Sequence, residues 1–306
     1  MLMADVLDAF QLPFVQRALV EVLLLSVAAG ALGTWIVLRG LAFYAHGVAA
    51  AAFPGLVLAD GLGFSAPLGA FGVALLFALL VGRLSARGRS GHDSLTALVL
   101  VGALAVGIVL ASDVFHSAAN VETLLFGSLL AVGPAEIRLA AVVAVLAALA
   151  TYVLGRRWLV VGFDAGAARA LGVRSPAADA VLLVLIALAA VATLSAAGAL
   201  LSTALLVVPA ATVRLVTRRM TPWQLGTVAL TAIEGTAGLW LSFQTNAPPG
   251  ATIAVIGGAV FVLAGLARAI AKPLGQRPRG TARPGASASV GRTRLEARSS
   301  TPTVEP

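Results

Sequence analysis

Residues 32–55 read LGTWIVLRGLAFYAHGVAAAAFPG, and Arg39 is the only charged side chain among them. The apolar residues on either side of Arg39 belong to two longer apolar stretches, 18–38 and 41–62. Each stretch has about the 20 residues that an α-helix needs to cross a bilayer. An arginine between two such stretches is typical of a loop at the membrane surface. The segment therefore predicts two membrane-spanning helices joined by a tight turn.

The composition of the whole chain also predicts a membrane protein. Hydrophobic residues make up 59% of the 306 residues and charged residues only 11%, and the mean hydropathy is +0.99. A soluble domain carries about 25% charged residues. The chain has no cysteine, which excludes a disulfide scaffold, thiolate metal ligands and a cysteine nucleophile. The N-terminal residues MLMADVLDAF lack Lys and Arg, so we expect no cleaved signal peptide.

Further apolar stretches predict an all-α, polytopic transmembrane bundle with eight or nine spans. Residues 121–132 are apolar but too short to cross, and we expect them to be re-entrant or interfacial. The remaining predicted spans are 66–82, 95–112, 137–154, 178–196, 198–216, 223–243 and 250–270.

Arginines orient these spans, because they follow every second one: Arg39, Arg83, Arg156, Arg214 and Arg268 all come at or near span ends on one side. Basic residues concentrate on the cytoplasmic side of membrane proteins. We therefore expect a multi-pass protein of the plasma membrane with a cytoplasmic C-terminus and, with nine spans, an external N-terminus.

The C-terminal residues differ from the rest. We expect residues 1–274 to form the transmembrane domain and residues 275–306 to be a disordered, basic cytoplasmic tail, because the tail is rich in Gly, Pro, Ser, Thr and Arg and has few apolar residues. From residue 271 onward there are seven basic residues against two acidic ones, a net charge of +5. The whole-chain charge of +8 is interpreted as membrane topology, and no aromatic-basic module predicts nucleic-acid binding.

Polar residues within the predicted spans are the candidates for a translocation path. His46 lies in an otherwise apolar segment, where an imidazole is either a metal ligand or a satisfied polar core residue. Glu234 lies deep in its span beside a glycine, and intramembrane carboxylates usually face a cavity or a partner. Pro209 frees a backbone carbonyl and predicts a kink, either static or moving. Glu21 and Asp60 lie near span ends, where a structural role is the simpler interpretation.

The loop 162–174, GFDAGAARALGVR, lies on the arginine-rich side. Asp164 is positioned to cap the N-terminus of a short helix that runs through Leu171, and Gly172 is positioned to end it. A capped helix between two spans is a suitable docking element for a soluble partner.

Taken in order, seven segments resemble the permease subunits of zinc/manganese/iron-type ABC importers, and the resemblance extends from about residue 12 to residue 270. The segments are LPFVQRALV (12–20), LGTWIVLRGLAFYAHGVAAAAFPG (32–55), HDSLTALV (92–99), LLFGSLLAV (124–132), FDAGAARALGV (163–173), GALLSTALLVVPAAT (198–212) and PPGATI (248–253).

The resemblance implies a type II-like importer fold and a second permease copy or paralogue. It also implies a cytoplasmic ATP-binding subunit and an extracytoplasmic substrate-binding protein. Segment 163–173, with Asp164, Ala167, Ala168, Leu171 and Gly172, would contact the ATPase. The chain has no GxxxxGK[ST] motif, so ATP hydrolysis would reside in another chain, and we expect this subunit to be no enzyme and to need no cofactor.

One departure concerns the substrate. Metal-transporting members of this family carry an aspartate and then a histidine four residues later on the second helix, and the matching positions here are His46 and Ala50. Residues at this spacing share a helix face, so His46 with Ala50 offers one metal ligand where the family offers two. The substrate is therefore left open between a metal ion and another small solute or a metal chelate.

Other classes of membrane protein remain as alternatives. A secondary transporter would need coupling-ion carboxylates or broken helices near the midplane, and Glu234 is the only such carboxylate. A channel is disfavoured because no charged ring or filter-like segment is visible. A purely structural membrane subunit is the third alternative.

Overall fold

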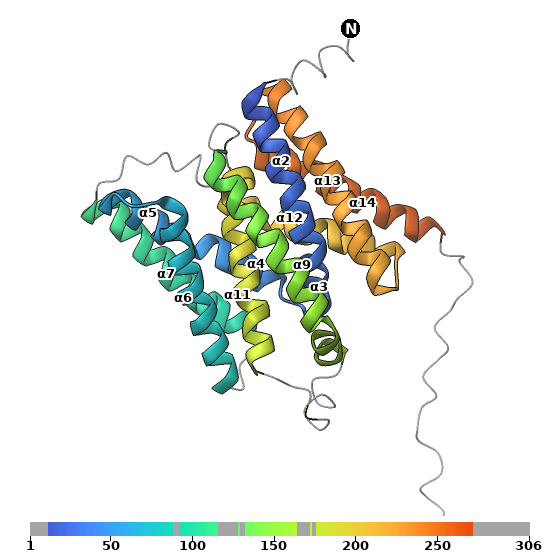
Figure 1. Ribbon diagram of the computed structural model, residues 1–306, viewed down its shortest axis with the longest axis horizontal. Coiled ribbons are helices and arrows are strands. Elements are labelled where there is room, and N and C mark those ends of the chain that lie inside the picture. Colours follow the sequence, from blue (N-terminus) through green and yellow to red (C-terminus); the bar gives the residue numbers. More distant parts are fainter. Residues whose placement is uncertain are drawn as a thin grey trace, which may run out of the picture. The chain divides into compact units, whose positions relative to one another are not determined.

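The computed structural model describes residues 12–87, 92–115, 128, 132–163, 172 and 176–271, and their regular secondary structure is entirely helical (Figure 1). By internal contacts the chain divides into two units, residues 1–268 and residues 269–306, and the first unit holds nearly all of the described helices. The predicted tail, 275–306, lies outside the described residues.

The first three elements form one continuous helix, because a π-helical turn joins two α-helical parts. Two short helices follow, separated at Ala52, and then longer ones. The elements are α2 (Pro13–Ala28), η1 (Ala29–Gly33), α3 (Thr34–Arg39), α4 (Ala42–Ala51), α5 (Phe53–Leu62), α6 (Ala66–Arg87), α7 (His92–Val109), η2 (Leu110–Val114), α9 (Pro134–Phe163), α11 (Pro176–Ala192), α12 (Leu194–Val216), α13 (Met220–Thr245) and α14 (Pro249–Ala271).

These helices match the predicted spans but differ among themselves in length and polarity. Six are long and apolar enough to cross a membrane: Pro13–Arg39, Ala42–Leu62, Ala66–Ser85, Asp93–Val114, Pro134–Gly162 and Pro249–Ala271. Within α11 and α12, the apolar helices Ala177–Ala192 and Ser202–Val216 are shorter. The 26-residue α13 is long enough but is more polar along its length. The predicted all-helical membrane bundle is confirmed, and the predicted count of eight or nine spans holds approximately.

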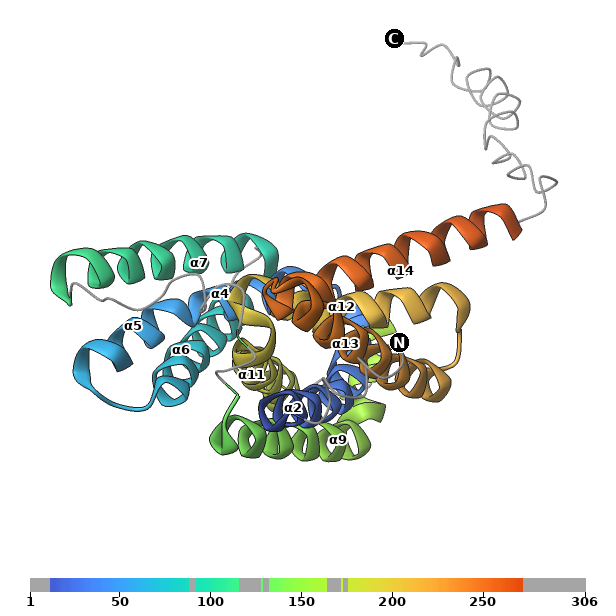
Figure 2. The same ribbon diagram turned by 90° about the horizontal axis from the view of Figure 1, so that it is seen from above.

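The first helix lies at the centre of the core. Its residues contact α9, α11, α12 and α13, and Figures 1 and 2 show these helices around it. Gly33 allows a close approach, because a Cβ at this position would overlap the backbone carbonyl of Leu206 on α12. Gly55 on α5 and Gly69 on α6 approach each other in the same way. Small residues at contacts let membrane helices pack backbone against backbone.

Buried aromatic side chains with polar tips link the arginine-bearing ends of the helices. The rings of Trp35 and Trp158 pack edge to face with centroids 5.6 Å apart. Trp158 Nε1 donates to the carbonyl oxygen of Ala178 at 2.8 Å, and the Tyr44 hydroxyl donates to that of Leu183 at 3.0 Å. These bonds join α9 and α4 to α11 and satisfy groups that would otherwise be buried without partners.

Candidate functional site

His46 lies on α4, a helix that contacts α6, α7, α11 and α12. Its Nδ1 is 3.1 Å from Thr203 Oγ1 on α12, and either atom can donate, depending on the imidazole tautomer. The imidazole is half-buried. Next to it, Gly47 leaves room for the methyl group of Thr96 on α7, which brings α7 close to the same turn. The helix packing therefore places an imidazole and a hydroxyl together from segments 157 residues apart.

The face of α4 that carries His46 is the face that this chain covers least. Ala42, Phe43 and His46 are the residues of α4 that are not buried, and Phe43 is 40% exposed. Ala50, one turn after His46, is 7% exposed and has no donor atom for a metal. In the described part of the chain, no group of three or more His, Cys, Asp or Glu residues could hold a metal ion.

Thr203 is the residue that sequence reasoning missed. It sits in the segment 198–212, which stands out in the sequence for its proline and small residues. A hydroxyl in such a segment was the only available signal, and threonines in membrane helices commonly bond to their own backbone instead. Thr212 on the same helix does so, donating to the carbonyl oxygen of Val208 at 2.8 Å.

Glu234 lies on α13 and is 3% exposed. Its Oε2 is 3.2 Å from the position that a Cβ of Gly257 on α14 would occupy, and a Val208 methyl lies 3.6 Å from that position. Its Oε1 has no hydrogen-bond partner within the described residues. Glu234 is therefore enclosed where α12, α13 and α14 meet.

The structure does not bring Glu234 and His46 together. Each adjoins α12, His46 through Thr203 and Glu234 beside Val208, five residues further along. Five residues correspond to about 140° around an α-helix. The two candidate path residues thus lie against different faces of α12.

The same helix contains Pro209, which is buried. The non-helical residue inside α12 is Gly198, with φ 72° and ψ 168°, a conformation that favours glycine. Helical structure continues through Pro209 to Val216. The break in α12 therefore falls at a glycine about three turns before the proline, five residues before Thr203.

The predicted coupling segment is described only at Phe163, the last residue of α9, and at Gly172, because Asp164, Ala167, Ala168 and Leu171 lie outside the described residues. Gly172 is exposed and has a φ of +67°, the left-handed conformation expected of a residue that ends a helix. Both flanks of the segment are anchored. Trp158 near the end of α9 bonds to α11, and Arg39 at the end of α3 pairs with Asp179 in the first turn of α11, Nη1 to Oδ1, at 2.9 Å.

Comparisons with known proteins cover most of the chain. The profile of the ABC 3 transport family matches residues 11–268. The manganese transport system membrane protein of Halalkalibacterium halodurans is 29% identical over 251 residues, which are 82% of this chain and 86% of that protein. The chelated iron transport system membrane protein of Yersinia pestis is 28% identical over 264 residues, 86% of this chain and 89% of that protein.

A solved structure agrees with these sequence matches. The PsaBC complex of Streptococcus pneumoniae, solved with a Fab, contains a chain that superimposes with a TM-score of 0.75 at 26% identity. The match covers 86% of this chain and 95% of that one. The sequence and structure comparisons therefore each cover more than four fifths of the chain, and the tail beyond residue 268 lies outside the family match.

Proposed function

Since this chain belongs to the ABC 3 transport family and is a membrane permease subunit of an ABC importer, we propose that its substrate is a transition-metal cation that passes the His46 face of α4. The observation that carries the proposal is the His46–Thr203 pair on the least covered face of that helix. Manganese and iron relatives support a metal substrate.

The His46–Thr203 pair is better suited to transient binding of a passing metal ion than to tight binding. One imidazole and one hydroxyl fill only part of a metal's coordination shell, and water or a second copy would supply the rest. A translocation path must bind its substrate strongly enough to admit it and weakly enough to release it. With alanine at position 50, each copy contributes a weak site, so we expect binding well above the nanomolar range.

A second permease copy completes the path in this proposal. In Figure 2, α7 and α14 lie along the same side of the bundle, opposite α9. Only 11% of the most apolar stretch of each of these two helices is buried within the chain. Because the open face of α4 adjoins α7, a partner on this side would bring two His46 side chains toward a shared path.

The other proposed partners follow from the family and the topology. In this proposal ATP hydrolysis resides in a separate ATP-binding subunit, which would contact segment 163–173 on the arginine-rich side. We infer that this side, together with the C-terminus, faces the cytoplasm. An extracytoplasmic binding protein would deliver the substrate at the opposite side. The positive-inside distribution of arginines supports this orientation.

A metal chelate is the second candidate substrate, favoured by the lack of three clustered ligand residues within the described residues. A chelator supplies its own donor atoms, so the path would need only polar contacts such as those of His46 and Thr203. The chelated-iron relative supports this alternative. The two candidate substrates differ in whether transport requires an imidazole that binds the metal ion directly.

Metal uptake in cells that depend on this system tests the proposal. We expect His46→Ala to lower the uptake of ⁵⁴Mn²⁺ or ⁵⁵Fe²⁺ by about tenfold or more, and Thr203→Val to lower it less. Ala50→His should strengthen binding by adding a second ligand one turn away. Thr212→Val is the matched control, because its hydroxyl on the same helix bonds only to Val208 among the described contacts.

The outcomes separate the candidates. Unchanged uptake of free metal in His46→Ala, at equal membrane levels of the protein, would refute a role for this imidazole in metal passage. Loss of uptake of a metal chelate in His46→Ala, with unchanged uptake of the free metal ion, would assign the path to chelates. Nanomolar binding at the unmodified site, abolished by Glu234→Gln, would show that Glu234 completes a site that the described geometry keeps apart.

A further inference from the structure

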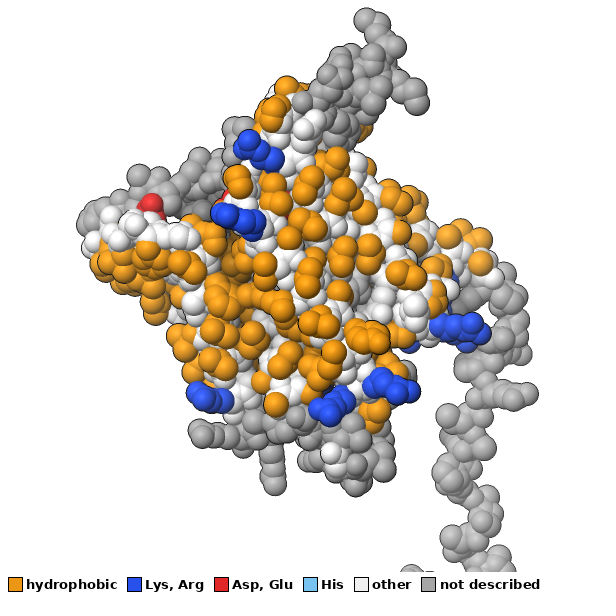
Figure 3. All heavy atoms as spheres, in the orientation of Figure 1, with side chains coloured by type: hydrophobic (Ala, Val, Ile, Leu, Met, Phe, Trp, Pro, Cys, Tyr) orange, Lys and Arg blue, Asp and Glu red, His pale blue; other side chains and the backbone are white. Residues whose placement is uncertain are grey.

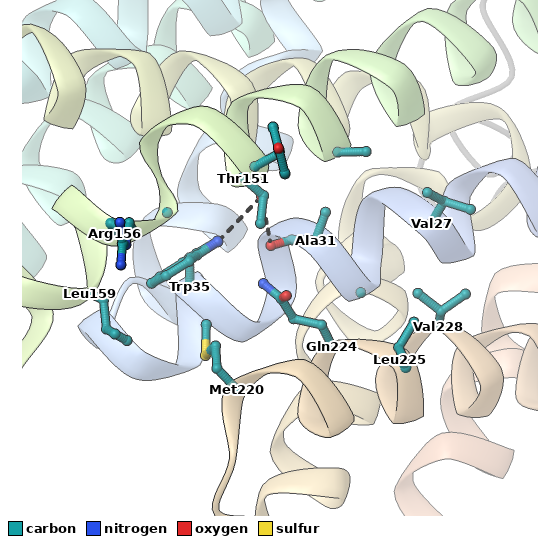
Figure 4. A pocket seen from close by; sticks show the side chains of 14 residues that line it. Val27, Ala31, Trp35, Thr151, Arg156, Leu159, Met220, Gln224, Leu225 and Val228 are labelled. Carbon is teal, nitrogen blue, oxygen red and sulfur yellow. Dashed lines mark hydrogen bonds between the residues drawn. The ribbon is translucent and has the colours of Figure 1, made fainter.

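A groove lies between α9, the first helix and α13 (Figure 4). In Figure 2, α9 and the first helix lie on the side of the bundle away from α7. Its volume is about 490 Å³, within the range of small-molecule sites. None of the residues considered for translocation or coupling lines it. It is therefore a separate feature of the molecule.

Small residues and a local change of helix type create this groove. Gly30 lies against α13, where a Cβ would overlap the side chain of Val228. Gly155 lies on α9, with the Trp35 ring 3.3 Å from where its Cβ would stand. The first helix is π-helical over Ala29–Gly33, and the carbonyl oxygen of Ala31 accepts from Thr151 Oγ1 of α9 at 3.4 Å. Single π-turns occur frequently at functional sites.

The rims of the groove are apolar and exposed. Among the residues that line the groove, Tyr152 on α9 is 87% exposed and Leu225 on α13 is 66% exposed. Figure 3 shows a face on which hydrophobic side chains cover the middle and arginine side chains lie toward the upper, lower and right-hand edges. In a membrane-spanning protein such side chains face lipid, so the groove opens to acyl chains.

Polarity changes along the groove in a defined order. Figure 4 shows Arg156 and Leu159 at one end, Thr151 and Gln224 in the middle, and Val27 and Val228 at the other end. The middle is polar through the Thr151 hydroxyl, which accepts from Trp35 Nε1 at 3.3 Å, and through the Gln224 amide, 3.5 Å from the Thr34 hydroxyl. A phospholipid has the same order of groups: a charged phosphate, ester oxygens and a hydrocarbon chain.

The charged end of the groove is positive. Arg156 and its neighbour Arg157 are exposed, and so is Arg219, just before α13. Among the residues described in the structure, no acidic side chain forms an ion pair with Arg156. A guanidinium is well suited to bind a phosphate through two parallel hydrogen bonds.

We propose that this groove is a binding site for one anionic phospholipid, with its phosphate at Arg156, its ester oxygens beside Thr151 and Gln224, and one acyl chain running toward Val27 and Val228. The lipid comes from the leaflet at the arginine-bearing side. It links α9 to α13 on the outer surface of the bundle. This site does not depend on the nature of the transported substrate.

Native mass spectrometry of the purified full-length protein tests the site, with phosphatidylglycerol and phosphatidylcholine of identical acyl chains as probes. The wild type should retain phosphatidylglycerol preferentially. Arg156→Gln should lower its bound fraction about fivefold, since one basic residue near the surface contributes about that ratio. Arg157→Gln is the matched control, because it removes the same charge one residue away but does not line the groove.

A second variant tests the hydrocarbon part. Ala148 lines the groove and is exposed, so Ala148→Trp should fill the groove without disturbing the core and should displace both lipids. Leu149→Trp places the same side chain on the neighbouring exposed position outside the groove and should leave retention unchanged. Equal retention of the two lipids by the wild type, or equal loss in Arg156→Gln and Arg157→Gln, would overturn the proposal. A change of oligomeric state in Ala148→Trp would assign the groove to a second copy of the chain and would also overturn it.

Discussion

Removing the ion pair between Arg39 and Asp179 should loosen the contact between the first helix and the start of α11. The two atoms, Nη1 and Oδ1, are 2.9 Å apart, and the side chains are 15% and 24% exposed. Exposed ion pairs contribute about 0.2–1 kcal/mol, and breaking a buried pair costs about 3–5 kcal/mol. A pair of intermediate exposure should therefore show a coupling free energy of about 1–2 kcal/mol.

A double-mutant cycle measures this coupling better than a charge swap. Asp179 lies in the first turn of α11 and Arg39 in the last turn of α3, so each charge also interacts favourably with its helix dipole. Exchanging the two residues would reverse both dipole interactions, each about 0.3–1 kcal/mol, and would hide the recovered pair. The cycle of Arg39→Gln, Asp179→Asn and the double variant cancels these contributions, because the interaction of each charge with its own helix dipole is the same whether or not the partner charge is present.

The assay is reversible unfolding of the purified protein in mixed detergent, with the free energy of unfolding measured for all four proteins. A coupling below about 0.3 kcal/mol would refute the reasoning, because the effects of substitutions at independent sites add to within about that amount. A functional measurement should follow the same pattern. The pair adjoins the segment proposed to contact the ATPase, so we expect the single variants to transport less substrate per ATP hydrolysed while binding the ATPase normally.

Three further variants test packing, coupling and the tail. Gly55→Ala should lower the free energy of unfolding by about 1–3 kcal/mol in the same assay, because its Cβ would overlap the backbone of Gly69. Gly72→Ala is the control and should not destabilise the protein, because nothing lies within 4 Å of its Cβ. Gly172→Trp should abolish stimulation of ATP hydrolysis without loss of membrane insertion, and normal stimulation would contradict the proposed role of this segment. Truncation after Leu274 should leave assembly of the complex intact by size-exclusion chromatography, and loss of the complex would show that the tail packs against the rest.

Much of the helix architecture was predictable because it depends on local properties of the chain. A helix in a membrane satisfies its own backbone hydrogen bonds, so length and hydropathy locate it without reference to its neighbours. The predicted spans correspond to α2–α3, α4–α5, α6, α7, α9, α11, α12, α13 and α14. The sequence was less informative about interruptions, since the break in α12 occurs at Gly198 and not at Pro209.

The candidate site was only partly predictable. His46 stood out as a lone imidazole in an apolar segment, whereas Thr203 carried no distinguishing signal. Glu234 and His46 were both candidates for one path, yet they lie against different faces of α12. Angular positions around a helix follow from residue spacing, but the neighbour that each face meets does not.

The sequence by itself determined that this protein is a helical membrane protein, where its helices lie and which span ends carry the arginines, because these properties depend on the transfer of individual residues between water and lipid. The tertiary structure alone decided that His46 meets Thr203 across 157 residues, that Arg39 meets Asp179 across 140, and that a groove opens between α9 and α13. These contacts depend on how close two backbones can approach. Gly30 and Gly33 have no side chain and so allow the facing helices to approach closely. Which helix faces each glycine is known only from the tertiary structure.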